Sequence, residues 1–198
     1  RHAATVDNLN WAAILDVTIN GSGRIEFKQH HLINKVKYGS GSWDYAGWPT
    51  DYALVGGQAV ALWVATIDPA AVRTTKDVDL LLNRADLPAA QTAARLIQMD
   101  YFETMGVGMF IDRQNPNPRH GVHLVWAGEK VRPGEPVSAP TLEHRHTLPG
   151  GRHVVSLAKL VEMKLTAFRD RDRVHLRDMI DVGLVDAAVV HQLPAALA

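Results

Sequence analysis

The stretch that decides the fold reads RTTKDVDLLL and covers residues 73–82. Two aspartates, Asp77 and Asp79, stand one residue apart at the start of an apolar run that predicts a buried strand. Because side chains at i and i+2 share one face of a strand, the two carboxylates are expected to project together. Mg²⁺ prefers such hard oxygen ligands and commonly takes one or two carboxylates, with phosphates and water completing its shell. Two solvated aspartates at a strand entrance would give the same pattern, so its interpretation depends on the surrounding sequence.

A second stretch, YALVGG at residues 52–57, lies upstream of the aspartates. Residues 52–55 predict a short buried strand, Gly56 and Gly57 predict a tight turn, and residues 58–65 predict a helix. A turn between a strand and a helix leaves backbone N–H groups and the positive helix end free to meet phosphate. An ordinary turn that needs a positive φ would also explain the two glycines. On the first interpretation, metal and phosphate sites lie close together.

The rest of the chain predicts a mixed α/β body followed by a helical tail. Helices are expected around residues 10–17, 87–99, 156–168 and 174–185, and strands within 24–38 and at 109–112 and 121–126. Residues 114–118 suit a hairpin loop, and the proline-rich residues 128–152 suggest a linker or surface excursion. We therefore expect one compact unit with three parts: an irregular N-terminal segment packed on the core (1–50), the core (51–150) and a C-terminal helical region (151–198).

Composition narrows the class of protein further. The chain has 198 residues, 46% of them hydrophobic, which is enough for one substantial core. Its 21 basic and 21 acidic side chains cancel, so any site for a polyanion must be local. The absence of cysteine excludes disulfides, thiolate zinc sites and a cysteine nucleophile, and it fits a reducing compartment. Without a long apolar run or a signal-peptide pattern, a cytoplasmic protein with no membrane partner is expected.

Taken together, LVGG at residues 54–57, the helix after it and RTTKDVDL at residues 73–80 resemble the signature of the nucleotidyltransferases of the DNA polymerase β superfamily. The tail, with MKLTAFRDR at 163–171 and RDMID at 177–181, resembles the abortive-infection branch related to AbiEii toxins. The resemblance covers about residues 51–185. It implies a mixed β-sheet flanked by helices, with a C-terminal helical tail.

The resemblance also implies an activity. An NTP bound through Mg²⁺ or Mn²⁺ would give its nucleoside monophosphate to a hydroxyl of an RNA, a protein or a small molecule, and pyrophosphate would leave. A cognate antitoxin would be a partner protein. The residues implied in these roles are Asp77 and Asp79 for the metal, and Gly56, Gly57, Lys76 and Lys164 for the nucleotide. A solvated or snorkelling helix residue is the alternative for Lys164.

Two departures from the superfamily pattern bear on catalysis. The turn usually has Gly followed by Ser, whereas Gly57 and Gln58 follow Gly56 here, which removes a hydroxyl contact with phosphate. Active members generally add a third carboxylate on a later strand, and His123 occupies that place in GVHLVW at 121–126.

His123 is therefore a candidate catalytic residue, as a general base or a nitrogen ligand, although it cannot supply the charge of a carboxylate. A half-buried strand histidine with a satisfied hydrogen bond is the alternative. Asp112 and Glu129 are candidate substitutes for the missing carboxylate.

The leading hypothesis is thus a metal-dependent nucleotidyltransferase, with a role as a toxin or in phage defence. The competing hypothesis is a catalytically silent nucleotide-binding or interaction module that keeps the fold. A hydrolase that uses His144 and His146 is a third and weaker hypothesis, because no nearby ligand set supports zinc. The alternating charges of residues 169–173 are expected to form a solvated, mutually paired surface.

Overall fold

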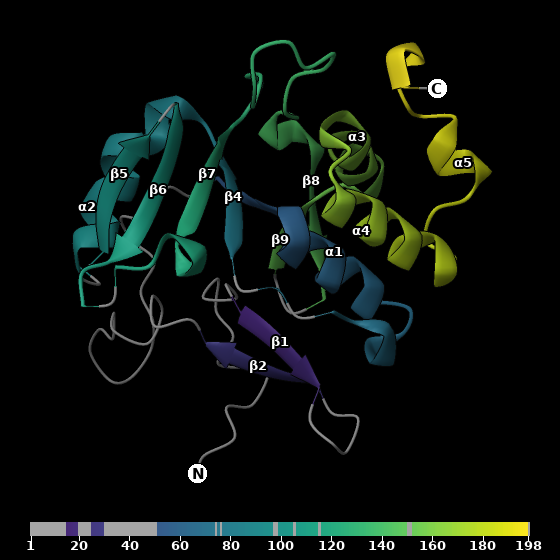
Figure 1. Ribbon diagram of the computed structural model, residues 1–198, viewed down its shortest axis with the longest axis horizontal. Helices are drawn as coiled ribbons and strands as arrows, with labels where there is room; N and C mark the ends of the chain where they lie inside the picture. Colours follow the sequence, from purple (N-terminus) through teal and green to yellow (C-terminus); the bar gives the residue numbers. More distant parts are fainter. Residues whose placement is uncertain are drawn as a thin grey trace.

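The fold is known from a computed structural model, which describes residues 15–19, 25–29, 51–73, 75, 77–96, 99–104, 106–114, 116–149 and 152–197. In the described part of the chain, a seven-stranded mixed sheet has the strand order β5-β6-β7-β4-β3-β9-β8. β4, which carries Asp79, is the central strand of this order. Figure 1 shows α1, α3 and α4 gathered towards one end of the sheet and α2 at the other end, beside β5. The predicted α/β class, a mixed sheet with flanking helices, is confirmed.

The strands of the large sheet are β3 (Ala53–Val55), β4 (Val78–Leu82), β5 (Met99–Thr104), β6 (Val107–Asp112), β7 (Val122–Trp126), β8 (Arg145–Leu148) and β9 (Arg152–Val155). The α-helices are α1 (Gly56–Ala65), α2 (Leu87–Leu96), α3 (Leu157–Ala167), α4 (Asp170–Asp181) and α5 (Ala187–Val190). Short 3-10 helices lie at Pro69–Ala71, Arg84–Asp86, Pro118–His120, Leu142–His144 and Ala195–Leu197. β4 runs antiparallel to β3 and parallel to β7, and β3 runs parallel to β9.

One face of the sheet is closed by α2. Val78, Leu80 and Leu82 alternate along β4 and are all buried on this face. They belong to one hydrophobic cluster with Ala90 and Ala94 of α2. The small side chains of these alanines let the helix approach the sheet closely. Because Val78, Leu80 and Leu82 are the β4 residues on this face, β4 contributes no polar side chain to it.

The opposite face of β4 carries both apolar and acidic side chains. Leu81 packs there in a second cluster, which contains Val60 of α1, Leu160 of α3 and Met179 of α4. Asp79 shares this face with Leu81 by strand alternation. Three helices therefore converge around the acidic end of the central strand.

The N-terminal expectation was wrong in part. Residues 15–17 were predicted as the end of a helix, but Leu15–Ile19 forms β1 and pairs antiparallel with β2 (Ile25–Gln29). The sequence LDVTI alternates and is rich in β-branched residues, which favours a strand. β2 falls within the range where a strand was predicted. The rest of residues 1–50, including 10–14, lies outside the described residues, so the predicted packing of this segment stays a prediction.

Three further strands depart from the predicted elements. β8 and the first residue of β9 fall in residues 128–152, where a linker was predicted, and β9 pairs with β3 inside the sheet. Both strands have only four residues, too few for their periodicity to stand out. The predicted boundary after residue 150 falls between them. β5 begins at Met99, where the second helix was predicted to end, and its outer half is exposed, so it shows no alternation.

The last long helix begins earlier than predicted. Residues 174–185 were expected to be helical, whereas α4 spans Asp170–Asp181. Its start is fixed by Asp172, whose carboxylate accepts hydrogen bonds from the backbone N–H of Arg169 at 3.2 Å and from its Nε at 2.7 Å. Within the described part of the chain, no helix is both long enough and apolar enough to span a bilayer.

Candidate functional site

The start of α1 lies directly against Asp79. Gly56 is the first residue of α1 and has a φ of +64°, a conformation that L side chains rarely adopt. A Cβ placed on Gly56 would stand 1.8 Å from Oδ2 of Asp79, which no side chain could tolerate. The register explains this closeness, because Val55 of β3 is paired with Asp79 of β4. The turn and the carboxylate, predicted from separate motifs, therefore form one site.

Asp77 lies just before β4 and is held by two neighbours. Thr75 Oγ1 donates a short hydrogen bond to Oδ1, and Arg171 Nη1 lies 3.4 Å from Oδ2. Burial alone would raise the pKa of the Asp77 carboxyl. The Thr75 hydrogen bond, a backbone hydrogen bond and the positive charge of Arg171 outweigh burial, and the net pKa is lowered. Asp77 is therefore ionised near neutral pH.

Asp79 has the opposite electrostatic character. Burial raises the pKa of its carboxyl, and the negative charge of Asp77 raises it further. His123, Lys164 and Arg171 act in the other direction but do not cancel these effects. Two carboxylates on one side of the strand thus repel each other, and a cation between them would relieve that repulsion.

His123 is placed beside Asp79. The two residues are register partners on the parallel strands β4 and β7, so their side chains share one face of the sheet. Nε2 of His123 lies 3.0 Å from the carbonyl oxygen of Pro118. Because a carbonyl oxygen only accepts, Nε2 carries the hydrogen in this bond, which leaves Nδ1 of the neutral ring as the nitrogen that can take a proton.

The two candidate substitutes for a third carboxylate lie away from this face. Asp112, at the end of β6, accepts a hydrogen bond from the backbone N–H of Gln114 and does not line the cavity. Glu129 is held in a bidentate pair by Arg84, at 2.8 and 2.6 Å, and does not line the cavity either. Over the described residues, no group of three or more His, Asp or Glu side chains is arranged to hold a metal ion.

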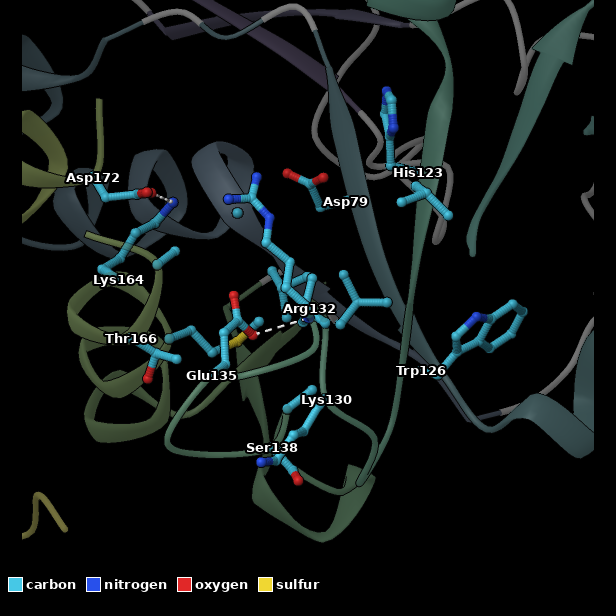
Figure 2. A pocket seen from close by; sticks show the side chains of 18 of the residues that line it. Asp79, His123, Trp126, Lys130, Arg132, Glu135, Ser138, Lys164, Thr166 and Asp172 are labelled. Carbon is cyan, nitrogen blue, oxygen red and sulfur yellow. Dashed lines mark hydrogen bonds and ion pairs between the residues drawn. The ribbon is translucent and has the colours of Figure 1, made fainter. Parts of the chain in front are cut away.

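A second set of charges faces the strand pair from α3 and α4. Lys164 is only 5% exposed, and its Nζ lies 3.0 Å from Oδ1 of Asp172, which is fully buried. Burial would raise the pKa of Asp172, but the hydrogen bond from Arg169 and the charge of Lys164 lower it. The Asp172 carboxylate is therefore ionised in this buried pair. Figure 2 shows Lys164 and Asp172 pointing towards each other on one side of the cavity, with Asp79 beyond them.

These groups border one cavity of about 350 Å³. Its lining includes Gly56, Asp77, Asp79, His123, Lys164, Arg169, Arg171 and Asp172. The loop after β7 adds Lys130, Arg132 and Glu135, and Figure 2 shows Arg132 reaching from this loop into the cavity. Over the described residues, neither Lys130 nor Arg132 makes a side-chain ion pair, so both cations are available to a ligand.

Other residues singled out by the sequence fall in different places. Lys76 lies outside the described residues. Gly57 approaches Thr75 so closely that a Cβ added to the glycine would lie 3.0 Å from Oγ1 of the threonine. Gln58 is buried and donates from Nε2 to the carbonyl oxygen of Thr75 at 3.3 Å. His144 contacts Thr141, and neither it nor His146 lines the cavity.

The alternating charges of residues 169–173 were expected to form a solvated, mutually paired surface, and this is confirmed except for Asp172, which is buried. Asp170 and Arg173 are indeed exposed, but Arg169, Arg171 and Asp172 line the cavity. One signal could have shown this: Asp172 lies eight residues after Lys164, across the break between the two helices, where opposite charges can meet. Residues of the loop after β7 had no such signal, because their prolines and glycines suggest only a surface excursion.

The donor set fits one divalent cation. Asp77 and Asp79 offer hard oxygen ligands of the kind that Mg²⁺ and Mn²⁺ take, and Gly56, whose missing side chain lets its backbone lie against Asp79, borders the same cavity. The set does not provide the three carboxylates of a two-metal centre in the described part of the chain.

Comparisons with known proteins found no related sequence and a weak structural similarity. No protein-family model matches the sequence, and no curated protein matches it. Among solved structures, the crystal structure of the Megavirus polyadenylate synthase matches with a TM-score of 0.39 and 10% sequence identity. The match covers 71% of this chain and 29% of that chain, so this chain spans less than a third of its length. At this TM-score the likeness says nothing about activity.

Proposed function

We propose that this protein is a nucleotidyltransferase that depends on Mg²⁺ or Mn²⁺ and transfers a nucleoside monophosphate from an NTP to an acceptor hydroxyl. The observation that carries the proposal is the contact between Gly56 and Asp79. It joins the N-terminus of a ten-residue helix, a favourable place for phosphate, to a pair of carboxylates that suits a divalent cation. Together these features favour a phosphate chain bound through a metal.

The roles of the residues follow from their places. Asp77 and Asp79 would hold the cation, which when bound offsets negative charge on the phosphates. Gly56 would admit the phosphates to the start of α1, and Lys164 would add a buried positive charge from α3. Arg171 of α4, with Lys130 and Arg132 of the loop after β7, also lines the cavity, and these cations would neutralise the rest of the triphosphate.

The transfer itself balances as follows. The acceptor oxygen attacks the α-phosphorus of the NTP, a new oxygen–phosphorus bond forms, and the bond between the α-phosphorus and the bridging oxygen breaks. Pyrophosphate leaves with that oxygen, and the proton of the acceptor hydroxyl passes to a base. Nδ1 of His123 is the candidate base, because Nε2 already donates to Pro118.

A second candidate, a silent nucleotide-binding or interaction module, has its own support. His123 occupies the register position opposite Asp79, where a third carboxylate would assist the attack of the hydroxyl. Asp77 is also paired with Arg171, a charge pair that a metal ion would have to displace. Such a module would bind an NTP with its metal but transfer nothing.

The test compares the parent with the Asp77→Asn, Asp79→Asn double variant. Each change keeps the side-chain shape and removes one negative charge, so the cation would lose its two anionic ligands while the fold survives. Calorimetry would measure NTP binding with Mg²⁺ or Mn²⁺, labelled NTPs would report transfer to mixed RNA and protein acceptors, and circular dichroism would confirm folding. Asp112→Asn is the matched control, because this carboxylate does not line the cavity.

The expected result is metal-dependent binding and transfer in the parent and in the control, and neither in the double variant. Unchanged binding in the folded double variant would show that the two aspartates are not the metal site. Binding that the double variant loses, without any transfer by the parent across the four NTPs, would identify the silent module.

The narrower proposal, a toxin or phage-defence role with a cognate antitoxin, rests on the resemblance of residues 163–171 and 177–181 to AbiEii-type proteins. Induced expression of the parent should arrest bacterial growth, and the double variant should not. Arrest that persists in the double variant at equal expression would separate toxicity from nucleotide transfer.

A further inference from the structure

A row of side chains crosses the sheet from the proposed site to the edge of the sheet. Asp79 of β4 is paired with His123 of β7, and Figure 2 shows these residues on neighbouring strands. His123 is paired in turn with Met109 of β6, and Met109 with Phe102 of β5. Paired residues on neighbouring strands share one face of a sheet, so these side chains all stand on the face that carries Asp79. Since β5 is an edge strand, the row ends at the edge of the sheet.

Packing on the opposite face supports this placement. Tyr101 and Phe110 are the sequence neighbours of Phe102 and Met109, and their ring centres lie 5.7 Å apart in an edge-on contact. Phe110 belongs to the hydrophobic cluster that contains the alanines of α2, and Tyr101 packs against that cluster. Because side chains alternate along a strand, Phe102 and Met109 stand on the side away from α2.

The part of the Asp79 face that β5, β6 and β7 form is open. Figure 1 shows α1, α3 and α4 beyond β4, on the side of β3 and β9, whereas β5 and β6 lie on the other side of β4. Phe102 is 48% exposed, and Val107, which lines the cavity, is 38% exposed. Over the described residues, neither Phe102 nor Met109 belongs to a hydrophobic cluster. We call this surface the open face, and it consists of Phe102, Val107, Met109, His123 and Val125.

The charges on and beside the open face suit a polyanion. Among the residues of β5, β6 and β7, the one carboxylate on this face is Asp100, and Arg113 neutralises it through hydrogen bonds of 2.9 and 2.6 Å. Lys130 and Arg132 line the cavity that reaches Val107. These cations, which would also meet the triphosphate, attract the phosphates of a strand that approaches from this side. A surface with an exposed ring and no unpaired carboxylate beside the metal pair therefore suits a ligand with both flat groups and phosphates.

We infer that the open face binds the acceptor of the reaction, and that this acceptor is a single-stranded nucleic acid. The inference rests on the proposed function and deepens it by naming the class of acceptor. At about 4.8 Å between neighbouring strands, Phe102 lies roughly 10 Å from His123 and roughly 14 Å from Asp79. The base of a nucleotide lies closer to its own phosphates than this. Phe102 is therefore placed for a base of the acceptor strand and not for the base of the NTP.

The row also fits the chemistry of transfer. His123 is the candidate base for the proton of the acceptor hydroxyl, and it is the first residue of the row after Asp79. A strand that lies along the row brings its terminal hydroxyl to Nδ1 of His123 and its bases to Met109 and Phe102. Exposed aromatic side chains on a sheet stack the bases of single strands, and such stacking accepts any base.

The test changes the ring at the end of the row. Phe102→Leu removes the aromatic ring and keeps an apolar side chain, whereas Phe102→Trp keeps a ring. Phe168 supplies the matched controls, Phe168→Leu and Phe168→Trp, because it is 49% exposed but lies at the end of α3 and not on the sheet. Calorimetry with Mg²⁺ measures binding of an RNA hexamer and of the four NTPs. Labelled NTPs report transfer to the hexamer and to peptides that contain Ser, Thr and Tyr, and circular dichroism confirms folding.

We expect Phe102→Leu to bind the RNA hexamer about tenfold more weakly than the parent, on the order of one stacking contact. Phe102→Trp and the Phe168 variants should bind the hexamer as the parent does. The hexamer should also quench the tryptophan emission of Phe102→Trp, because a stacked base quenches an indole, more than it quenches that of Phe168→Trp.

Three results would overturn the inference. The first is full binding of the hexamer by Phe102→Leu without quenching in Phe102→Trp. The second is an equal loss of NTP binding in Phe102→Leu, which would assign the open face to the base of the NTP. The third is transfer to the peptides that falls in Phe102→Leu while the hexamer accepts nothing, which would assign the face to a protein acceptor.

Failure of the proposed function would look different. A parent that binds no NTP with Mg²⁺ or Mn²⁺ contradicts nucleotidyl transfer, whatever Phe102 does. Hexamer binding and the quenching of Phe102→Trp then still decide whether the open face binds a single strand. A parent that binds NTPs with metal but binds no hexamer keeps the proposed function and refutes the inference alone.

Discussion

Substituting Gly56 with alanine tests the contact on which the proposed site depends. Two costs add up at this position. The φ of +64° is unfavourable for alanine by about 1–2 kcal/mol. The new Cβ would also stand 1.8, 2.6 and 2.9 Å from Oδ2, Cγ and Cβ of Asp79, so the carboxylate must leave its place. Overpacking of this kind costs about 1–3 kcal/mol, and the sum is a loss of roughly 2–5 kcal/mol in the free energy of unfolding.

Two further variants separate these costs. Gly183 has a φ of +77° and no neighbouring atom within 4 Å of an added Cβ, so Gly183→Ala should show only the conformational cost. In an Asp79→Ala background, the clashes with Oδ2 and Cγ disappear. Gly56→Ala should then lower the free energy of unfolding by about 1–2 kcal/mol less than it does in the parent. A double-mutant cycle detects this difference as a coupling energy.

Urea unfolding followed by circular dichroism measures the free energy of unfolding of the parent and of the four variants (Gly56→Ala, Gly183→Ala, Asp79→Ala and the double variant). Calorimetry with Mg²⁺ and an NTP measures binding at the site. Gly56→Ala should abolish metal-dependent binding, because the carboxylate has been displaced, and Gly183→Ala should keep it. The reasoning fails if Gly56→Ala costs no more than Gly183→Ala, or if its cost is the same with and without the Asp79 carboxylate.

Three other perturbations have definite expected outcomes. Lys164→Met removes one partner of a buried ion pair with Asp172 and should lower the free energy of unfolding by about 3 kcal/mol in urea titrations, and a loss below about 1 kcal/mol would contradict the pairing. Burial lowers the pKa of His175 from 6.5 to about 4, so folding favours its neutral form. The contribution of this group to the free energy of unfolding is complete above pH 6.5 and falls by about 1–2 kcal/mol at pH 5. His175→Gln should reduce this dependence on pH in unfolding experiments. His123→Asp puts a third carboxylate in register with Asp79. The variant should have a lower melting temperature than the parent without metal, and Mn²⁺ should raise its melting temperature by more than it raises that of the parent. An unchanged effect of Mn²⁺ on the melting temperature would place residue 123 outside the metal's reach.

The local signals in the sequence were sufficient for the centre of the site. A strand, two glycines and a helix form a unit whose geometry is fixed within a few residues, and the spacing of Asp77 and Asp79 fixes their shared side. The closeness of Gly56 to Asp79 needed one further fact, the pairing of β3 with β4, which the order of the motifs suggests because neighbouring segments commonly pair.

The features of the site and fold that the sequence did not predict depend on packing between segments far apart in the chain. Asp172 is fully buried although its sequence surroundings are highly charged, because Lys164 and Arg169 enclose it after α3 and α4 have packed. Nothing in the local pattern of alternating charges distinguishes Asp172, which is buried, from Asp170, which is exposed. The pairing of β9 with β3 is also non-local, because it joins Leu54 to Val154. A four-residue strand has too little periodicity to reveal its partner from the sequence.

Some of the charges around the cavity are paired with one another. Asp77 is paired with Arg171, and Lys164 is paired with Asp172, so carboxylates of the strand end and cations of the helices are already partly neutralised. On the proposed function, a divalent cation at Asp77 would take over the role of Arg171 and leave that guanidinium for a phosphate. The metal and the triphosphate would then each improve the site for the other, because each supplies a charge that the other's binding leaves unpaired. Metal and nucleotide should therefore bind together much more tightly than either binds alone. Arg171→Ala removes the cation that competes with the metal for Asp77. This variant should bind the metal alone more tightly than the parent does, and its binding of metal and nucleotide should be less cooperative. Independent binding of metal and nucleotide in the parent would show that the Arg171 contact with Asp77 is only a surface ion pair.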